Sequence, residues 1–234
     1  MERYKAWLCL KSAPLLGTKG MLELLQNYPD PQEFVGKPSH PVYQSGKLKP
    51  ATIKHLSEFT LPEDSKRIIT LMEKHQLQYI CLTDPDYPAA LKEIFDPPLI
   101  LYYKGDLAGT LKDLCIAVVG TRKPTSYGVE MCRKLLSPLC AKGVNVISGL
   151  AMGIDTIAHQ TALKAKTKTI AVFASGLENI YPPMNKILAE HISENGALVS
   201  EYEPGSKLER WNFPSRNRII SALANAVLVV EGSL

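Results

Sequence analysis

The sequence predicts an α/β fold: a doubly wound, mainly parallel sheet that follows a small helical module. From about residue 63 onward, short segments of nearly continuous apolar residues recur, which is typical of parallel strands covered on both faces. Helix-like segments separate them, so strand and helix alternate along the chain. Residues 1–62 show no strand patterning and are instead interrupted by Pro and Gly. We therefore expect two domains, 1–62 and 63–234.

The first domain is expected to contain three short helices. Amphipathic patterns cover residues 2–13, 18–28 and 49–59, and the Pro-rich segment YPDPQEFVGKPSHPVY joins the last two. The PLLGTKG turn between the first two helices is similar to the turn of DNA-binding helix-hairpin-helix motifs. That signal is weak, and an ordinary turn between helices is the favoured interpretation.

The second domain begins with a predicted helix over residues 61–76, in which apolar residues can form one face. Apolar strand patterns and amphipathic helix patterns then alternate. The predicted strands are 77–83, 99–105, 114–120, 144–149, 169–175, 197–202 and 226–232, and the predicted helices between the last five are 127–142, 153–166, 183–195 and 215–225.

The composition excludes several classes of protein. No apolar run reaches the roughly 18 residues that a membrane-spanning helix needs, and the N-terminus makes a poor secretory signal. The five cysteines form no CxxC or Cys/His cluster, which predicts reduced core thiols without a zinc site or disulfides. The net charge of +4 permits a polyanionic partner, and a mixed solvated surface explains it equally well. We expect a cytoplasmic protein without a cofactor.

Candidate ligand-binding residues follow the first of the five core strands, residues 114–120. In such sheets, ligands bind at the carboxyl ends of the strands. In VVGTRKPTSYG, Gly120 permits a tight turn, Thr121 offers a hydroxyl, and Arg122 offers a cationic donor beside a helix N-terminus. The segment is neither GxGxxG nor followed by GKS or GKT, which argues against a dinucleotide or P-loop site. The alternative is a turn with solvated basic residues.

The second core strand, residues 144–149, leads into SGLAMGIDTIAHQTAL. The N–H groups after Ser148, together with Gly149 and Gly153, could form a phosphate cradle at a helix start. Asp155 and His159 are four residues apart on one helix face, which suits either a catalytic pair or a structural hydrogen bond that orients the loop. The structural interpretation is favoured.

The ends of the third and fourth core strands, residues 169–175 and 197–202, add further candidates. After the third strand, Tyr181 could stack on a base, and Asn185 and Lys186 lie in the first turn of the next helix. After the fourth, Arg216 and Arg218 are predicted to project from the first turn of a helix that begins near Pro214. Cations are unfavourable there unless an anion or a carboxylate such as Glu201 compensates. The remaining candidate of this group is Asn217.

In this order, five segments resemble the DNA-processing protein A family, also called DprA or Smf: VVGTRKPTSYG, VISGLAMGIDTIAHQTAL, TIAVFASGLENIYPPMN, LVSEYEPG and FPSRNRIISAL. DPDYPAALKEIFDPPLILYYKGDL resembles the segment that leads into the family's core, and the N-terminal helices resemble its SAM-like module. The resemblance implies an extended Rossmann-like core. It also implies DNA binding by Arg122 and the Gly149/Gly153 loop, with Lys186 and the RNR trio as further contributors, unless Arg216 or Arg218 braces the loops through Glu201.

The resemblance also implies partners. The family binds single-stranded DNA with little sequence preference and delivers it to a RecA-type recombinase during natural transformation, displacing single-strand-binding protein. It self-associates, so a homodimer is expected, and neither catalysis nor a metal is implied. The family continues beyond VLVVEG into an SGSL-type segment and more sheet, which leads us to expect that this chain is truncated near Leu234.

Two enzymatic alternatives depend on motifs that are missing here. A phosphoribohydrolase of the Lonely guy class would cleave nucleoside monophosphates at a similar pocket, but it carries a PGGxGT motif where this chain reads VLVVEGSL. An NAD-dependent oxidoreductase would need GxGxxG. The sequence therefore favours a DNA-binding protein, with the phosphoribohydrolase as the runner-up.

Overall fold

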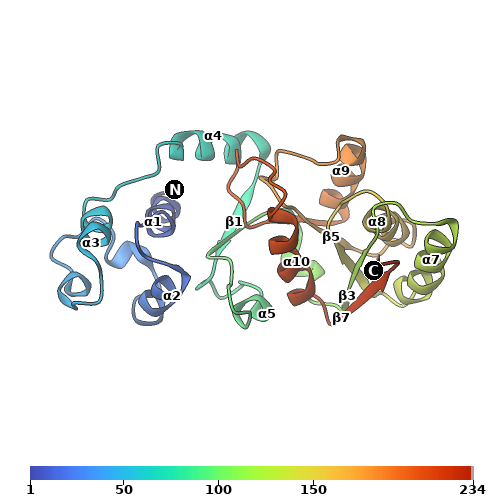
Figure 1. Ribbon diagram of the computed structural model, residues 1–234, viewed down its shortest axis with the longest axis horizontal. Coiled ribbons are helices and arrows are strands. Elements are labelled where there is room, and N and C mark those ends of the chain that lie inside the picture. Colours follow the sequence, from blue (N-terminus) through green and yellow to red (C-terminus); the bar gives the residue numbers. More distant parts are fainter. Residues whose placement is uncertain (233–234) are drawn as a thin grey trace.

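The computed structural model describes residues 1–232 of the 234-residue chain. Seven strands form one sheet in the order β1-β2-β6-β5-β4-β3-β7, and the predicted α/β fold is confirmed (Figure 1). The strands are β1 (Gln78–Cys81), β2 (Ile100–Gly105), β3 (Cys115–Gly120), β4 (Asn145–Ser148), β5 (Thr169–Val172), β6 (Gly196–Ser200) and β7 (Ala226–Val230). The SGSL-type continuation predicted near Leu234 lies outside the described residues.

The sheet is mainly parallel, as predicted. Pairing is parallel from β6 through β5, β4 and β3 to β7, with Gly120 opposite Val230 at the carboxyl ends of β3 and β7. Strand β2 is antiparallel to both of its neighbours, β1 and β6. In the pairing with β6, Tyr102 lies opposite Ser200. The carboxyl ends of five parallel strands therefore meet at one edge, where the candidate residues follow them.

Helices cover both faces of the sheet. The helices are α4 (Ser65–His75), α5 (Ala89–Lys92), α6 (Leu107–Thr110), α7 (Ser126–Cys140), α8 (Ile154–Lys164), α9 (Lys186–Asn195) and α10 (Asn212–Ala222), with a 3-10 turn η3 (Pro183–Asn185) before α9. Val118 packs with α7 and α8, whereas its neighbour Ala117 belongs to the cluster that contains Ile219 of α10. Because successive strand residues point to opposite faces, α10 lies across the sheet from α7 and α8.

Two features differ from the predicted elements. The helices α5 and α6 were not predicted, because four residues are too few to show a helical period in the sequence. Helix α10 begins at Asn212, three residues before the predicted start, so that Pro214 occupies its first turn. Proline is tolerated there because the first N–H groups of a helix have no partner within the helix.

The N-terminal module is helical, as predicted, and shares its core with the sheet. It consists of α1 (Glu2–Lys11), α2 (Thr18–Asn27), η1 (Pro31–Glu33), η2 (Pro41–Gln44) and α3 (Pro50–Ser57). The ring of Tyr4 lies 4.8 Å from that of Tyr79, and its hydroxyl lies 3.1 Å from that of Tyr102. The module lies at the opposite end of the molecule from α7 (Figure 1). A domain boundary at residues 62 and 63 stays a prediction.

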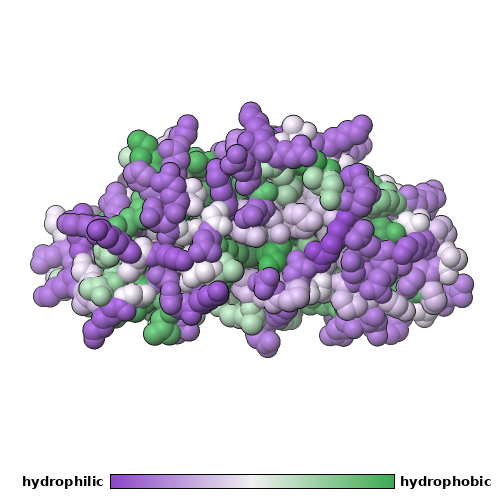
Figure 2. Space-filling view, turned by 180° about the vertical axis from the view of Figure 1, so that it is seen from behind, coloured by the Kyte–Doolittle hydropathy of each residue, from purple (hydrophilic) through white to green (hydrophobic). Residues whose placement is uncertain are grey.

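The outer surface is mostly polar. Figure 2 shows hydrophilic side chains over most of one face, with hydrophobic ones in small, separate areas. All five cysteines are buried and free, in agreement with the predicted core thiols. Within the described part of the chain, no helix is both long and apolar enough to cross a membrane.

Candidate nucleic-acid interface

The loop after β3 presents two exposed cations. Arg122 and Lys123 are exposed, and neither forms an ion pair within residues 1–232. The Thr121 N–H donates to the carbonyl of Glu231 at 3.0 Å, and the Thr121 hydroxyl oxygen accepts the Lys123 N–H at 3.2 Å. Thr125 caps α7, its hydroxyl oxygen accepting the N–H of the third helical residue at 3.1 Å. The loop is thus held rigidly while both cations remain free to bind an anion.

Arg122 is held against an aromatic ring. Its guanidinium carbon lies 4.6 Å from the ring centroid of Phe213, which is close enough for a cation–π interaction. The ring of Tyr181, from the loop after β5, meets Phe213 edge to face at 6.3 Å and is 44% exposed. Residues from three strand ends therefore form one continuous group, which we call the Arg122–Phe213–Tyr181 platform.

Glycines allow the loops to approach this closely. A side chain at Gly153, where φ is 83°, would collide with the backbone of Thr121 and Arg122. The backbone of Gly120 likewise leaves no space beside the Val230 carbonyl, and the face of Gly149 lies against the guanidinium of Arg216. These three glycines bring chain segments together, so their role in the structure is close packing.

The predicted phosphate cradle after β4 is already occupied by a carboxylate of the protein. One oxygen of Asp155 accepts the N–H groups of Gly149 and Ala151 at 3.2 and 3.3 Å. The hydroxyl of Ser148 is buried and donates to the Val118 carbonyl at 2.6 Å. The expectation of free N–H groups at this position is therefore corrected: Asp155 satisfies them and fixes the loop.

Asp155 and His159 do not form the expected hydrogen bond with each other. His159 is fully buried, and its Nδ1 lies 2.8 Å from the Thr169 hydroxyl, which itself donates to the Val146 carbonyl. Since that hydroxyl has no second proton, Nδ1 must donate, and Nε2 is left as an unprotonated acceptor. Burial lowers the pKa of His159 to about 3, so the ring is neutral at physiological pH.

Arg216 is buried, which corrects the prediction that it projects from a helix start. It lies in the second turn of α10, and its Nη1 donates to the carbonyls of Gly149, at 2.8 Å, and Val172. Its Nε donates to the side-chain oxygen of Asn217 at 3.2 Å. Burial lowers the pKa of Arg216 to about 10 and the charge of Asp155 opposes the shift, so the guanidinium stays charged. Arg216 therefore joins the ends of β4 and β5 from within.

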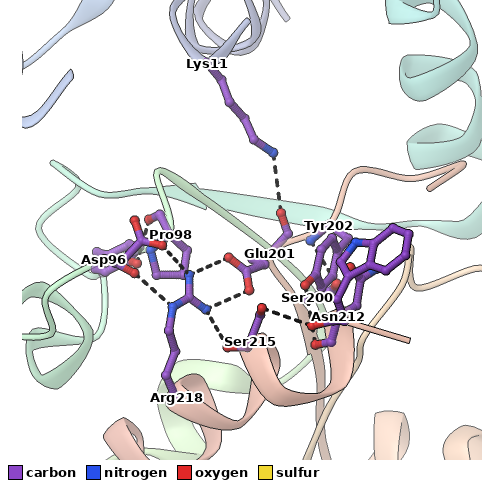
Figure 3. A network of polar contacts seen from close by, with 11 residues as sticks. Lys11, Asp96, Pro98, Ser200, Glu201, Tyr202, Asn212, Ser215 and Arg218 are labelled. Atoms are coloured by element: carbon purple, nitrogen blue, oxygen red, sulfur yellow. Dashed lines mark hydrogen bonds and ion pairs between the residues drawn. The ribbon is translucent and has the colours of Figure 1, made fainter. Parts of the chain in front are cut away.

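Arg218 braces the rim, by which we mean the loops that follow the carboxyl ends of the parallel strands. It does so through Glu201, which is one of the two roles that the sequence left open. Figure 3 shows its guanidinium forked onto the Glu201 carboxylate, with N–O distances of 2.7 and 2.6 Å. Its Nε also donates to the Asp96 carbonyl at 3.1 Å. On the other side, Lys11 of α1 pairs with Glu203 at 3.0 Å. This network holds α10, the end of β6 and the N-terminal module together.

The remaining predicted residues divide into one buried and two exposed. Asn185 is buried and donates to the Leu150 carbonyl and the Thr156 hydroxyl, both at 2.9 Å, which joins the loops after β4 and β5. Lys186, the first residue of α9, and Asn217 are exposed. Of the predicted residues, Arg122, Tyr181, Lys186 and Asn217 are thus the exposed ones.

Sequence reasoning missed the aromatic residues at the start of α10. Phe213 lies in the platform, and Trp211, two residues earlier, is 69% exposed. The segment ERWNFPSRNR contains both rings among three arginines. Two aromatic residues in a polar segment beyond a strand end are a detectable signal, because a ring with an apolar face and a polar edge suits a partly exposed binding surface.

Comparison with known proteins identifies the family of this chain. The family described as DNA recombination-mediator protein A matches residues 78–234. The chain belongs to this family. It is 38% identical over 203 residues to the DNA processing protein DprA of Bacillus subtilis, which is 87% of this chain and 68% of that protein. It spans about half the length of further curated relatives, 42% and 54%. The predicted resemblance is confirmed.

Two solved structures of the recombination-mediator family resemble this one. The X-ray structure of DprA from Streptococcus pneumoniae superimposes with a TM-score of 0.80 at 32% identity, covering 97% of this chain and 77% of that one. DNA processing protein A from Helicobacter pylori, described with a single-stranded DNA binding mode, has a TM-score of 0.58 at 35% identity and covers 65% and 68%. The extended Rossmann-like fold is shared with these relatives.

Proposed function

We propose that this chain binds single-stranded DNA at the carboxyl ends of its parallel strands. The observation that carries the proposal is the Arg122–Phe213–Tyr181 platform, which offers an exposed guanidinium beside exposed aromatic surface. Single-strand-binding sites combine cations for the backbone with rings on which bases stack. The single-stranded DNA binding mode described for the Helicobacter pylori relative supports the same assignment.

The platform favours single strands over duplexes for a physical reason. Stacking on Tyr181, Phe213 or Trp211 requires an open base face, which a paired and stacked duplex does not offer. Arg122, Thr121, Lys186 and Asn217 are assigned to the DNA backbone, since phosphate contacts carry no sequence information. The residues with supporting roles, which shape and fix the rim, are Gly120, Ser148, Gly149, Gly153, Asn185, Arg216 and Arg218.

The direct test is fluorescence anisotropy with labelled oligo-dT and with a duplex of equal length. We expect tighter binding of the single strand, little difference between base sequences, and a log–log salt slope of about −0.7 per neutralised phosphate. Equal affinities for single strand and duplex at moderate salt would contradict the proposal.

We infer that the bound DNA is passed to a RecA-type recombinase in natural transformation, with displacement of single-strand-binding protein. The description of the family as recombination mediators supports this step. The protein would act as a homodimer in the cytoplasm. Filament formation by the recombinase on DNA coated with single-strand-binding protein measures the transfer, and light scattering measures the dimer. If filament formation is no faster than with the recombinase alone, the proposed transfer is contradicted.

We also infer that the protein is not a hydrolase. The acid and base that the sequence offered as a catalytic pair, Asp155 and His159, are buried and hydrogen-bonded within the loop and the sheet. The alternative phosphoribohydrolase would release ribose phosphate from AMP. Turnover that His159→Ala abolishes would reject a purely binding role.

A further inference from the structure

A basic groove runs along α7 and α8, outside the residues assigned to the rim. One hollow of about 650 Å³ lies along α7 and is lined by Ser126, Val129, Glu130, Arg133, Lys134 and Ser137. A second, of about 520 Å³, lies between α7 and α8 and is lined by Arg133, Ser137, Gln160, Thr161, Lys164 and Ala165. Both hollows are open to solvent and share Arg133 and Ser137, so they form one shallow groove, which we call the α7–α8 groove.

The groove is cationic and its cations are available. Arg133, Lys134 and Lys164 are exposed, and none of them forms an ion pair within the described part of the chain. Glu130 is the one carboxylate among the lining residues of both hollows. The rest of the lining is mainly hydroxyl, amide and small side chains, which suits the oxygens of a phosphate chain better than an apolar peptide.

The groove is continuous with the rim. Ser126, the first residue of α7, follows directly on the loop that carries Arg122. From Ser126, the lining residues Glu130, Arg133 and Ser137 follow at intervals of four, three and four, which keeps them on one face of the helix. The eleven-residue separation corresponds to roughly 16 Å of helix. A strand that leaves the platform at Arg122 and follows this face meets Arg133 and Lys134 midway along α7, and Lys164 on the neighbouring α8.

We propose that the α7–α8 groove extends the DNA path beyond the rim and binds the backbone of the same single strand, mainly through Arg133 and Lys164. This inference rests on the proposed single-stranded DNA binding and adds a direction to it. Helices α7 and α8 lie side by side at the end of the molecule away from the N-terminal module (Figure 1). The strand would thus run from the centre of the molecule toward this end.

The test compares short and long oligonucleotides. Affinities are measured by anisotropy for oligo-dT of about six nucleotides, near the lower end of known site sizes, and of about 25 nucleotides, above their upper end of about 16. In Arg133→Ala/Lys164→Ala, we expect the long oligonucleotide to bind about tenfold more weakly, with a salt slope smaller by about 1.4, because two phosphate contacts are lost. Binding of the short one should be unchanged.

The control is Lys66→Ala/Lys74→Ala, which removes the same charge from exposed positions of α4 outside both hollows. It should leave the affinity and the slope for the long oligonucleotide unchanged. Equal effects of both double variants would mean that only net charge matters, and would overturn the groove.

Arg122→Ala, measured in parallel, separates the two proposals. If it weakens binding of both oligonucleotides while Arg133→Ala/Lys164→Ala binds like the parent, the rim stands and the groove is overturned. If the groove variant loses only the stimulation of recombinase and keeps its DNA affinity, the groove contacts an acidic protein instead, which also overturns the DNA path. A parent protein that binds no single strand would reject both proposals.

Discussion

Removal of the Arg218 guanidinium should destabilise the protein measurably. The side chains of Arg218 and Glu201 are 26% and 17% exposed, so their pair lies between surface and buried ion pairs. Exposed pairs contribute about 0.2–1 kcal/mol, whereas breaking a buried pair costs about 3–5 kcal/mol. The pair is bidentate and Arg218 also holds the Asp96 carbonyl. We therefore expect Arg218→Ala to lose about 2 kcal/mol, which lowers Tm by about 4–8 °C in a chain of this size.

The assay is a double-mutant cycle with Glu201→Gln, measured by urea unfolding and thermal melts. The two single variants should each be destabilised, and the double variant by about 1 kcal/mol less than their sum. Lys5→Ala is the control, because the Lys5–Glu2 pair is a surface pair within one helix and should matter by less than about 0.5 kcal/mol. If Arg218→Ala melts like the parent, or if the two single effects simply add, the bracing role is refuted.

Three further predictions concern the rim and the buried histidine. Arg122→Ala should weaken oligo-dT binding about ten- to a hundred-fold, through loss of a charged contact worth about 1.5–3 kcal/mol, with unchanged Tm; Arg122→Lys should recover part of it, and full affinity in the alanine variant would refute the site. Phe213→Leu should weaken oligo-dT about tenfold in the same anisotropy assay through lost stacking, while Tyr79→Phe, a change far from the rim, should not. Because burial lowers the pKa of His159 to about 3 from 6.5, the folded state resists protonation, and stability present above pH 6.5 should be lost as the pH falls toward 3, by up to about 1.4 kcal/mol per pH unit. In urea unfolding from pH 7 to 5, His159→Leu should show a shallower loss, and equal slopes would contradict a neutral buried ring.

The sequence predicts the sheet well because its signal is local. Each core strand is a short apolar run, and a parallel strand buried on both faces has no polar alternation to obscure it. The order in which candidate loops follow the strands then places them at one edge without any knowledge of side-chain contacts. Gly153 illustrates how far this goes: its position after a strand indicates a tight approach, and its φ of 83° agrees.

The burial of individual polar residues could not be predicted in the same way. Arg216 is buried because carbonyls from the ends of β4 and β5 converge on one point, and neither carbonyl is near it in the sequence. Asp155 looked like a partner for His159 by helical spacing, yet its oxygen is taken by N–H groups four and six residues earlier. Spacing gives the possible partners of a polar group, whereas the chosen partner depends on which group is otherwise left unsatisfied.

Arg122, Arg216 and Arg218 show how the surroundings of an arginine determine its role. Arg216 lies where carbonyls converge, and its guanidinium is hydrogen-bonded within the protein. Asp155 supplies the compensating charge nearby. Arg218 meets a carboxylate and joins neighbouring segments. Among residues 1–232, the guanidinium of Arg122 has no carboxylate partner and lies over an aromatic face, which attracts the cation without neutralising it. A guanidinium that is positioned but not neutralised keeps its capacity for a phosphate, and the other two hold still the surface on which it is presented. We therefore propose Arg122 as the DNA-binding arginine, because it is the one of the three whose charge the described residues leave uncompensated.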